Sequence, residues 1–264
     1  MERIIEISRS HSAEAHRQEV EHFDQHWRQV WKEGKLDLVI PPDEEIWRRD
    51  LGRARRIAFE WLGDLRGKRV LELGCGPGDN TILMARRGAN VIALDIAPSS
   101  LDITRRCASA NRLERSVHLS RMMAESLAFR NGSFDWVVGF GFLHHVDSST
   151  IGDELRRVLR PDGRALFFEP LGTNPLLEFS REHLPYRGKH HSPNEHPLTY
   201  DDLRHMGKSF KHARAREFYL FSMISRVVAS ERAFGALWAL DEFLIKHLRA
   251  VRRWCRYVLV EYEL

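Results

Sequence analysis

Several features that define other classes of protein are missing from this chain of 264 residues. No apolar run approaches the roughly 18 residues that a membrane-spanning helix needs. The charged first residues, Met1-Glu-Arg-Ile-Ile-Glu6, lack the layout of a signal peptide. There is no internal repeat, no low-complexity segment and no long block of like charges. We therefore expect a cytoplasmic protein with no transmembrane segment.

Cysteine is scarce, and this limits metal and disulfide chemistry. Cys75, Cys107 and Cys255 match no zinc spacing, and an odd number of thiols predicts reduced cysteines. Histidines are frequent in the segment 183–196, but no Cys or Asp is interleaved with them, so we expect no bound metal. The net charge of +4 comes mostly from arginine and is typical of a solvated surface. We expect no nucleic-acid partner.

The most informative segment is the run Val70-Leu-Glu-Leu-Gly-Cys-Gly-Pro-Gly78, an apolar strand followed by a glycine-rich turn. A second apolar strand ends in Asp95, about 20 residues after the first glycine, which is typical of a βαβ nucleotide site. The dinucleotide fingerprint requires glycine at position 79, where this chain has Asp79, and Pro77 has no N–H to donate. These residues disfavour a pyrophosphate. They favour a ligand with an amino acid end and no phosphate, namely S-adenosylmethionine (SAM).

Strands and helices alternate through the middle of the chain, which predicts an α/β doubly wound sheet. We expect strands at 69–73, 90–95, 116–120, 134–140 and 163–169, and helices at 79–87, 98–111 and 148–160, with a turn at 161–163. Helices are also expected at 11–33 and 44–62. After a loop or lid at 171–198 we expect a helix at 199–209, a strand at 213–222, helices over 223–253 and a final strand at 256–264.

The order and spacing of four motifs resemble the class I SAM-dependent methyltransferases. The resemblance covers roughly residues 66–170, and its motifs are 70–78, Asp95, 124–138 and 155–163. It implies a Rossmann-like, doubly wound seven-stranded sheet with an antiparallel C-terminal hairpin and helical cap elements at both ends of the chain. It divides the chain into an N-terminal helical cap (1–66), a SAM-binding core (67–170), and a lid loop, helical insertion and last two strands (171–264).

The resemblance also implies roles for single residues. Glu72 would orient the glycine turn, Asp95 would bind the ribose hydroxyls, and Ile96 would pack on the adenine. One position departs from the family pattern: an acid often precedes Ala124, and this chain has Met123 there, so that contact is lost or is replaced by Glu125. The full set of expected cofactor-binding residues is Glu72, Gly74, Cys75, Gly76, Gly78, Asp95, Ile96, Met123, Ala124, Glu125 and Phe140.

Candidates for the chemistry lie where strands end, because ligands bind at the carboxyl ends of a parallel sheet. His144 and His145 follow the strand 134–140, and Glu169 ends the strand 163–169; a direct catalytic role competes with local hydrogen bonding. Trp27 and Trp31, at helical spacing, are candidate substrate-binding residues, with core packing as the alternative. Arg187, in the basic lid, is another candidate, and a solvated loop is its alternative.

We expect methyl transfer from SAM, with S-adenosylhomocysteine as product, to a small hydrophobic acceptor such as a specialised metabolite or lipid-like acid. In-line displacement mainly requires that the acceptor be held about 3 Å from the methyl group. The alternatives are a methyltransferase of RNA or protein, a non-catalytic SAM-fold binding protein, and a disfavoured NAD-dependent oxidoreductase. The basic apolar segment 223–253 is expected to roof the pocket, with peripheral membrane contact less favoured. We expect a monomer or homodimer.

Overall fold

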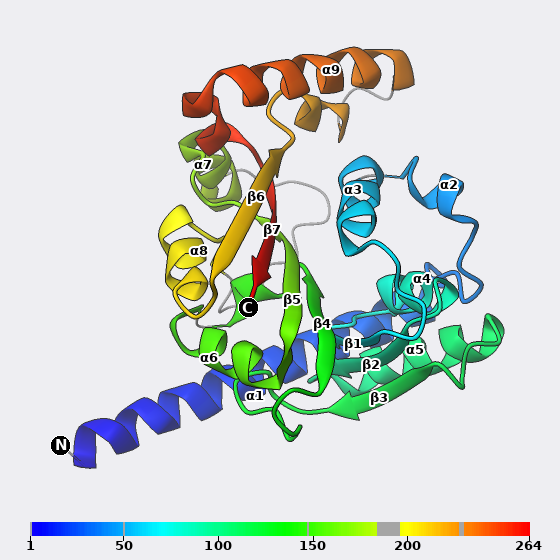
Figure 1. The fold of residues 1–264 in the computed structure, drawn as a ribbon, viewed down its shortest axis with the longest axis vertical. Coiled ribbons are helices and arrows are strands. Elements are labelled where there is room, and N and C mark those ends of the chain that lie inside the picture. The colour runs from blue at the N-terminus through cyan, green and yellow to red at the C-terminus, as the bar shows by residue number, and fades with distance from the viewer. Residues whose placement is uncertain (1, 50, 147, 184–195, 227–229) are drawn as a thin grey trace.

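Seven strands form one sheet in the computed structural model, which describes residues 2–49, 51–146, 148–183, 196–226 and 230–264. The strand order is β3-β2-β1-β4-β5-β7-β6 (Figure 1). The first five strands are parallel, and β7 runs antiparallel between β5 and β6. The strands are β1 (Arg69–Leu73), β2 (Asn90–Asp95), β3 (Val117–Arg121), β4 (Phe134–Phe140), β5 (Leu159–Pro170), β6 (His212–Phe218) and β7 (Tyr257–Glu263). The predicted seven-stranded sheet with its antiparallel hairpin is confirmed.

Helices cover both faces of this sheet. The α-helices are α1 (Glu2–Lys32), α2 (Asp43–Ile46), α3 (Gly52–Leu62), α4 (Asp79–Arg86), α5 (Pro98–Ala110), α6 (Ser148–Val158), α7 (Pro175–His183), α8 (Tyr200–Gly207) and α9 (Glu231–His247). Within the described ranges, the 3-10 helices are η1 (Leu143–His145), η2 (Ser222–Arg226) and η3 (Arg249–Trp254). No helix among the described residues is both long enough and apolar enough to cross a membrane.

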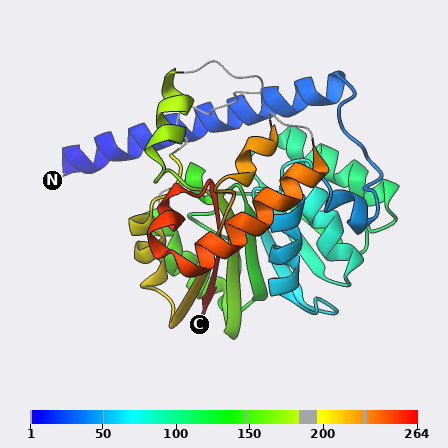
Figure 2. The same ribbon diagram turned by 90° about the horizontal axis from the view of Figure 1, so that it is seen from above.

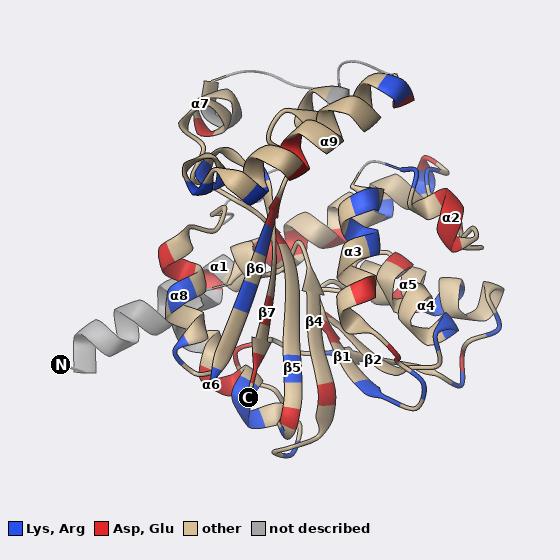
Figure 3. Ribbon diagram, turned by 45° about the horizontal axis from the view of Figure 1, so that its top comes forward, with Lys and Arg blue, Asp and Glu red and all other residues tan. Residues whose placement is uncertain are grey.

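The two faces of the sheet carry separate apolar cores. Side chains of α3, α4 and α5 pack on one face, and those of α6 and α8 pack on the other. Figure 3 shows the central strands mostly tan, because a sheet that is covered on both sides buries apolar residues on both sides. The chain passes from β1 outward to β2 and β3, then returns to β4 on the other side of β1. This reversal opens a crevice at the carboxyl ends of β1 and β4.

Helix α1 crosses the end of the sheet at which the parallel strands finish, as the view from above shows (Figure 2). Asp24 fixes it there: its carboxylate accepts the backbone N–H of Ser99 at 2.9 Å, and its carbonyl accepts the Ser99 hydroxyl at 3.1 Å. Ser99 lies in the first turn of α5, directly after β2. The N-terminal helix is therefore held over the crevice by the core itself.

Most predicted elements are confirmed, but the helix expected at 44–62 is wrong. The chain forms two helices there, α2 and α3, because Leu51 adopts a left-handed conformation with φ of 61°. Gly52 follows, where a Cβ would lie 2.5 Å from the carbonyl oxygen of Ile46. Only glycine permits this close approach of the two backbone segments.

The expected turn at 161–163 is also wrong, because those residues lie inside β5. Leu159 pairs with Phe134 and Arg164 pairs with Trp136, so β5 carries extra residues as a bulge-like irregularity opposite β4. Helix α7 lies in the segment 171–198 that was expected to be a loop. Asn174 begins it by accepting the N–H of Leu176 at 3.0 Å, a helix-starting role typical of asparagine. Residues 184–195 of the predicted lid lie outside the described residues.

Candidate active site

The turn after β1 requires glycine at three positions. Gly74, Gly76 and Gly78 have φ values of 65°, 52° and 92°, in the region where other residues are strained. A Cβ at Gly78 would lie 2.9 Å from the Thr104 side chain, and one at Gly74 would lie 2.8 Å from the Phe142 ring. The turn is therefore packed closely between α5 and the loop that follows β4, with bare backbone facing the crevice.

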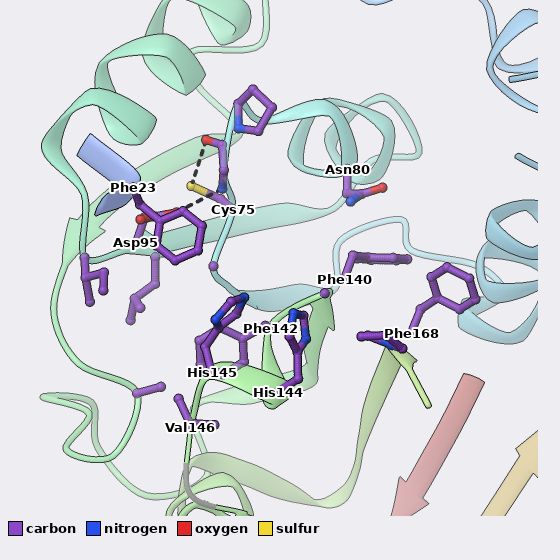
Figure 4. Close-up of a pocket in the computed structure, with 18 of the residues that line it drawn as sticks. Phe23, Cys75, Asn80, Asp95, Phe140, Phe142, His144, His145, Val146 and Phe168 are labelled. Atoms are coloured by element: carbon purple, nitrogen blue, oxygen red, sulfur yellow. Dashed lines mark hydrogen bonds between the residues drawn. The ribbon is translucent and has the colours of Figure 1, made fainter. Parts of the chain in front are cut away.

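Asp95, the last residue of β2, is held against this turn. The Gly76 N–H donates to Oδ2 at 3.0 Å, and the Ala97 N–H donates to Oδ1 at 2.9 Å. Burial raises the pKa of the Asp95 carboxyl, while these two hydrogen bonds oppose the rise. Figure 4 shows Asp95 beside Cys75 at one side of the pocket.

Glu72 lies beneath the turn and not in the crevice. It is buried, and the Thr81 hydroxyl of α4 donates a hydrogen bond to it. Burial raises the pKa of Glu72 to about 8. The side chain thus joins β1 to the first turns of α4 from behind, and its predicted role in orienting the glycine turn would be exerted from that position.

A cavity of about 600 Å³ lies between the turn, α1, α3 and the ends of β4 and β5. Of the residues singled out from the sequence, its lining includes Trp27, Gly74, Cys75, Gly76, Asp95, Ile96, Ala124, Glu125, Phe140, His144 and His145. Glu72, Gly78, Met123, Trp31 and Glu169 are not part of the lining, and Arg187 lies outside the described residues. Lining residues that sequence reasoning missed include Arg55, Asn80, Phe142, Phe168, Arg256 and Tyr257.

One end of the cavity carries the residues expected around a nucleoside. Asp95 and Ile96 follow β2, and Ala124 and Glu125 come from the segment after β3. His16 of α1 reaches Glu125, with Nε2 and Oε1 3.4 Å apart, and closes this end from above. Met123, by contrast, is 39% exposed and is not part of the lining.

The other end of the cavity carries a cation and an anion that do not form an ion pair with each other. Arg55 of α3 and Asp79, the first residue of α4, both line it, together with Asn80. Burial lowers the pKa of Arg55, and the charges of Asp79 and Glu72 oppose that shift. The Arg55 guanidinium makes no hydrogen bond or ion pair to another residue within the described ranges. A buried guanidinium without a paired carboxylate is costly, so this end favours a ligand that brings its own anionic group.

His144 lies in the middle of the cavity wall and is held by Glu169. The His144 Nδ1 is 2.7 Å from Oε2 of Glu169, while Oε1 accepts the N–H groups of Phe142 at 2.9 Å and Leu143 at 3.0 Å. Glu169 is completely buried at the end of β5. The predicted histidine and carboxylate are therefore coupled: only the histidine reaches the cavity, and the carboxylate fixes the loop and the ring behind it.

His145 faces the cavity from the same 3-10 helix and meets α1. Its ring lies edge-on to Phe23, with centroids 5.1 Å apart, and its Nδ1 is 3.8 Å from the Glu19 carboxylate. Figure 4 shows both histidine rings projecting into the pocket from below Phe23. Although several acidic and imidazole groups gather here, the described residues contain no group of three or more that could hold a metal ion.

Aromatic rings form the wall beyond His144. Phe168 stacks on Tyr257 with centroids 5.0 Å apart, and Phe140 stacks on Phe59 of α3 at 5.8 Å. Tyr257 also contacts Tyr219, which in turn packs on Trp238 of α9. Helix α9 thus packs against this wall from outside, and none of its residues is part of the cavity lining. The predicted tryptophans separate: Trp27 packs 3.4 Å from where a Gly76 Cβ would lie, whereas Trp31 is exposed and stacks on Arg106.

Comparison with known proteins agrees with this arrangement. Residues 70–163 match the family described as "Methyltransferase domain". The chain is 35% identical over 162 residues to a magnesium-protoporphyrin O-methyltransferase of Rhodobacter capsulatus, which covers 60% of this chain and 70% of that protein. It is 39% identical over 120 residues to a demethylmenaquinone methyltransferase of Thermus thermophilus, covering 44% of this chain and 54% of that protein.

Among solved structures, the chain resembles the geranyl diphosphate C-methyltransferase of Streptomyces coelicolor in complex with Mg²⁺, geranyl diphosphate and S-adenosyl-L-homocysteine. The TM-score is 0.56 at 18% identity, over 80% of this chain and 79% of that one, which establishes a shared fold. The chain spans just over half the length of the first curated relatives it matches, between 54% and 56%. By its sheet order, its glycine turn and its sequence similarity, the chain belongs to the class I SAM-dependent methyltransferases.

Proposed function

We propose that this protein transfers a methyl group from SAM to a small hydrophobic acceptor. One observation carries the proposal: a single cavity runs from the glycine turn and Asp95, past His144, to the aromatic wall of Phe140 and Phe168. A volume of about 600 Å³ lies within the range of small-molecule sites. Such a cavity brings two ligands together in an enclosed space, which is the main requirement of an in-line transfer.

The residues present fit SAM on chemical grounds. The Asp95 carboxylate is an acceptor suited to the ribose hydroxyls, and the glycine turn offers a surface that side chains would otherwise fill. Arg55 and Asp79 together complement the carboxylate and the ammonium of a zwitterionic amino acid end. The same Asp79 would repel a pyrophosphate, which argues against a dinucleotide.

The main task that we assign to the residues of this chain is to position the acceptor and the cofactor. SAM would supply an electrophilic methyl group, which passes from sulfur to the acceptor atom with S-adenosylhomocysteine as the leaving group. His144 is proposed to take the acceptor's proton: an Nδ1–H that donates to Glu169 leaves Nε2 as the nitrogen that accepts a proton. Glu169 is then a positioning residue, because it sets the tautomer and holds Phe142 and Leu143 in place.

The acceptor class follows from the wall opposite the glycine turn. Phe140, Phe168, Tyr257 and Leu51 present mainly apolar surface, and His144, His145 and Arg256 supply the polar groups. This combination suits a ring-containing or prenyl-like molecule with one ionisable hydroxyl or acidic carbon. The curated relatives named above are a demethylmenaquinone methyltransferase and a magnesium-protoporphyrin O-methyltransferase, and these names support a small-molecule acceptor for this chain.

A label-transfer assay tests the proposal. Purified protein and methyl-labelled SAM are incubated with an extract of the source cells, which is then separated into organic, aqueous, protein and RNA fractions. We expect label in the organic fraction, and none when the Asp95→Ala variant replaces the natural protein. Label confined to RNA or protein would replace the acceptor class by the macromolecular alternative. Binding of SAM with no label in any fraction would favour a non-catalytic SAM-fold protein.

A further inference from the structure

Exposed apolar side chains concentrate at one end of the molecule. Among the described residues, the large apolar side chains that are exposed outside this end are Trp31, Val39 and Met123. The others are Leu176 and Phe179 of α7, Phe221 and Ile224 at η2, Leu240 and Phe243 of α9, and Leu248 before η3. We call these seven residues the α9 face. A monomeric protein rarely gathers so many without using them.

Helix α9 is apolar on two sides, and packing explains only one of them. Its inner side carries Trp238, whose ring contacts Tyr219 at 5.5 Å, and Ile245, which is buried. Its outer side carries Leu240 and Phe243, with exposed alanines at 236 and 239 on the same stripe. A helix that only roofed the acceptor cavity would be polar on its outer side. The outer apolar stripe therefore needs a partner of its own.

The segments of the α9 face are tied together. The buried Asp241 of α9 accepts the N–H groups of Leu220, Phe221 and Ser222 at 2.8–3.0 Å, which fixes η2 against the helix. Asn174, which begins α7, donates to the carbonyl of Trp254 in η3 at 2.7 Å. Figures 1 and 2 agree in placing α7, η2, α9 and η3 on the same side of the molecule. Hydrogen bonds therefore join η2 to α9 and α7 to η3, so the segments that carry these apolar residues are held in pairs.

Cations border this surface, and acids are few. Lys246 and Arg249 follow Phe243 along the chain, and both are exposed. Arg249, Arg252 and Arg253 line a hollow of about 390 Å³ beside the end of α9, together with the buried Glu217, whose carboxylate lies 3.9 Å from Arg252. The acids of α9 are mostly engaged, because Asp241 is buried and Glu242 accepts a hydrogen bond from Arg216. Figure 3 shows α9 tan between charged ends, with blue at η3.

We propose that the α9 face docks on the surface of a lipid bilayer that contains anionic lipids. Apolar side chains on one stripe with guanidinium and ammonium groups at the border match the boundary between acyl chains and phosphate headgroups. The positive border selects an anionic lipid surface over a neutral apolar partner. Where the proposed function holds, docking also places Tyr219 and Tyr257, which connect α9 to the acceptor wall, close to the reservoir of a lipophilic acceptor. The docking itself does not depend on that function.

Vesicle co-sedimentation tests the proposal without any activity measurement. The full chain is mixed with vesicles of phosphatidylcholine alone or of equal parts phosphatidylcholine and phosphatidylglycerol. We expect binding to the anionic vesicles only, weakened by salt because the attraction between surface charges is screened. The variant Leu240→Glu/Phe243→Glu should lower the partition coefficient at least tenfold. Arg249→Gln/Arg253→Gln should lower it about tenfold.

A matched control separates the α9 face from general surface hydrophobicity. Val39 is 64% exposed, close to the 61% of Phe243, but lies between α1 and α2, so Val39→Glu should leave binding unchanged. Circular dichroism confirms that each variant folds. Equal binding to both kinds of vesicle, or natural-level binding by the Leu240→Glu/Phe243→Glu variant, overturns the proposal. A homodimer that this variant dissociates, with no binding to either vesicle, would assign the face to a second copy and also overturns it.

Discussion

Replacing Glu169 by glutamine should impair catalysis while leaving the cofactor site intact. One oxygen of the carboxylate accepts a hydrogen bond from His144, and the other accepts hydrogen bonds from two backbone N–H groups. Glutamine has one acceptor oxygen and one NH₂ group, so it cannot serve both sides. Because the two backbone donors cannot change, the amide oxygen faces them and the NH₂ group faces His144. The imidazole then accepts at Nδ1 and carries its proton on Nε2, which is the wrong tautomer for a base.

The structure sets the size of both effects. Hydrogen bonds to a charged group contribute about 1.5–3 kcal/mol each and neutral ones about 0.5–1.5 kcal/mol, so the change from charged to neutral bonds at Glu169 should lower the unfolding free energy by about 2 kcal/mol in total. A positioned general base contributes about 10²–10⁴ in rate, and the wrong tautomer removes most of it. The kcat of Glu169→Gln should therefore fall at least 100-fold, with SAM affinity unchanged.

Asp241→Asn is the matched control, because Asp241 is also a buried carboxylate that accepts from successive backbone N–H groups. Both variants should lose similar stability in urea, but only Glu169→Gln should lose kcat. Nitrogen NMR of the His144 ring gives a second readout, since the protonated ring nitrogen should change from Nδ1 to Nε2. If Glu169→Gln keeps the natural tautomer, or keeps kcat within a few-fold of the natural protein, His144 is not the base and the reasoning fails.

Three further predictions concern the cofactor end. Asp95→Ala should lower the affinity for both SAM and methylthioadenosine at least tenfold. Arg55→Met should lower only the affinity for SAM, because methylthioadenosine lacks the amino acid end. If calorimetry finds that Arg55→Met lowers both affinities equally, Arg55 does not bind the amino acid end. Trp27→Ala should lower the affinity for SAM several-fold and Trp31→Ala should leave it unchanged, since only the Trp27 ring covers the turn. A larger loss of affinity for Trp31→Ala than for Trp27→Ala in the same titration would contradict this placement of Trp27. For Glu72, burial raises the pKa to about 8, above its ordinary 4.5, so the folded state holds this proton more tightly. The unfolding free energy should therefore be greatest below pH 4.5 and fall as pH rises towards 8, and Glu72→Gln should flatten that fall in urea titrations from pH 5 to 9.

The core strands could be predicted because a parallel sheet buries both faces. Residues 69–73, 90–95 and 134–140 are therefore nearly continuous apolar runs, and Gly74 and Gly141 directly follow the first and the last of them. The glycine turn could also be predicted from the sequence, since three residues in left-handed conformations require glycine. Local rules also pointed to α7, where Asn174-Pro175 is a helix-starting pair, although the abundance of His, Pro and Gly nearby favoured a loop.

Other parts of the site depend on tertiary contacts that no local pattern records. Trp27 and Trp31 share one face of α1, but they stand about 6 Å apart along the axis, and the cavity ends between them. Arg55 is one arginine among several in α3, and only the packing of that helix against the turn buries its guanidinium. Glu169 was predicted as a group facing the crevice, whereas the fold places His144 between it and the cavity.

A crystal structure with S-adenosylhomocysteine is the most direct test of the central claim. The account predicts the ribose hydroxyls on Asp95, the amino acid carboxylate on Arg55, and the sulfur directed towards His144 and the aromatic wall. The ligand bound in the opposite sense, with its adenine beside Arg55, or bound outside this cavity, would contradict it.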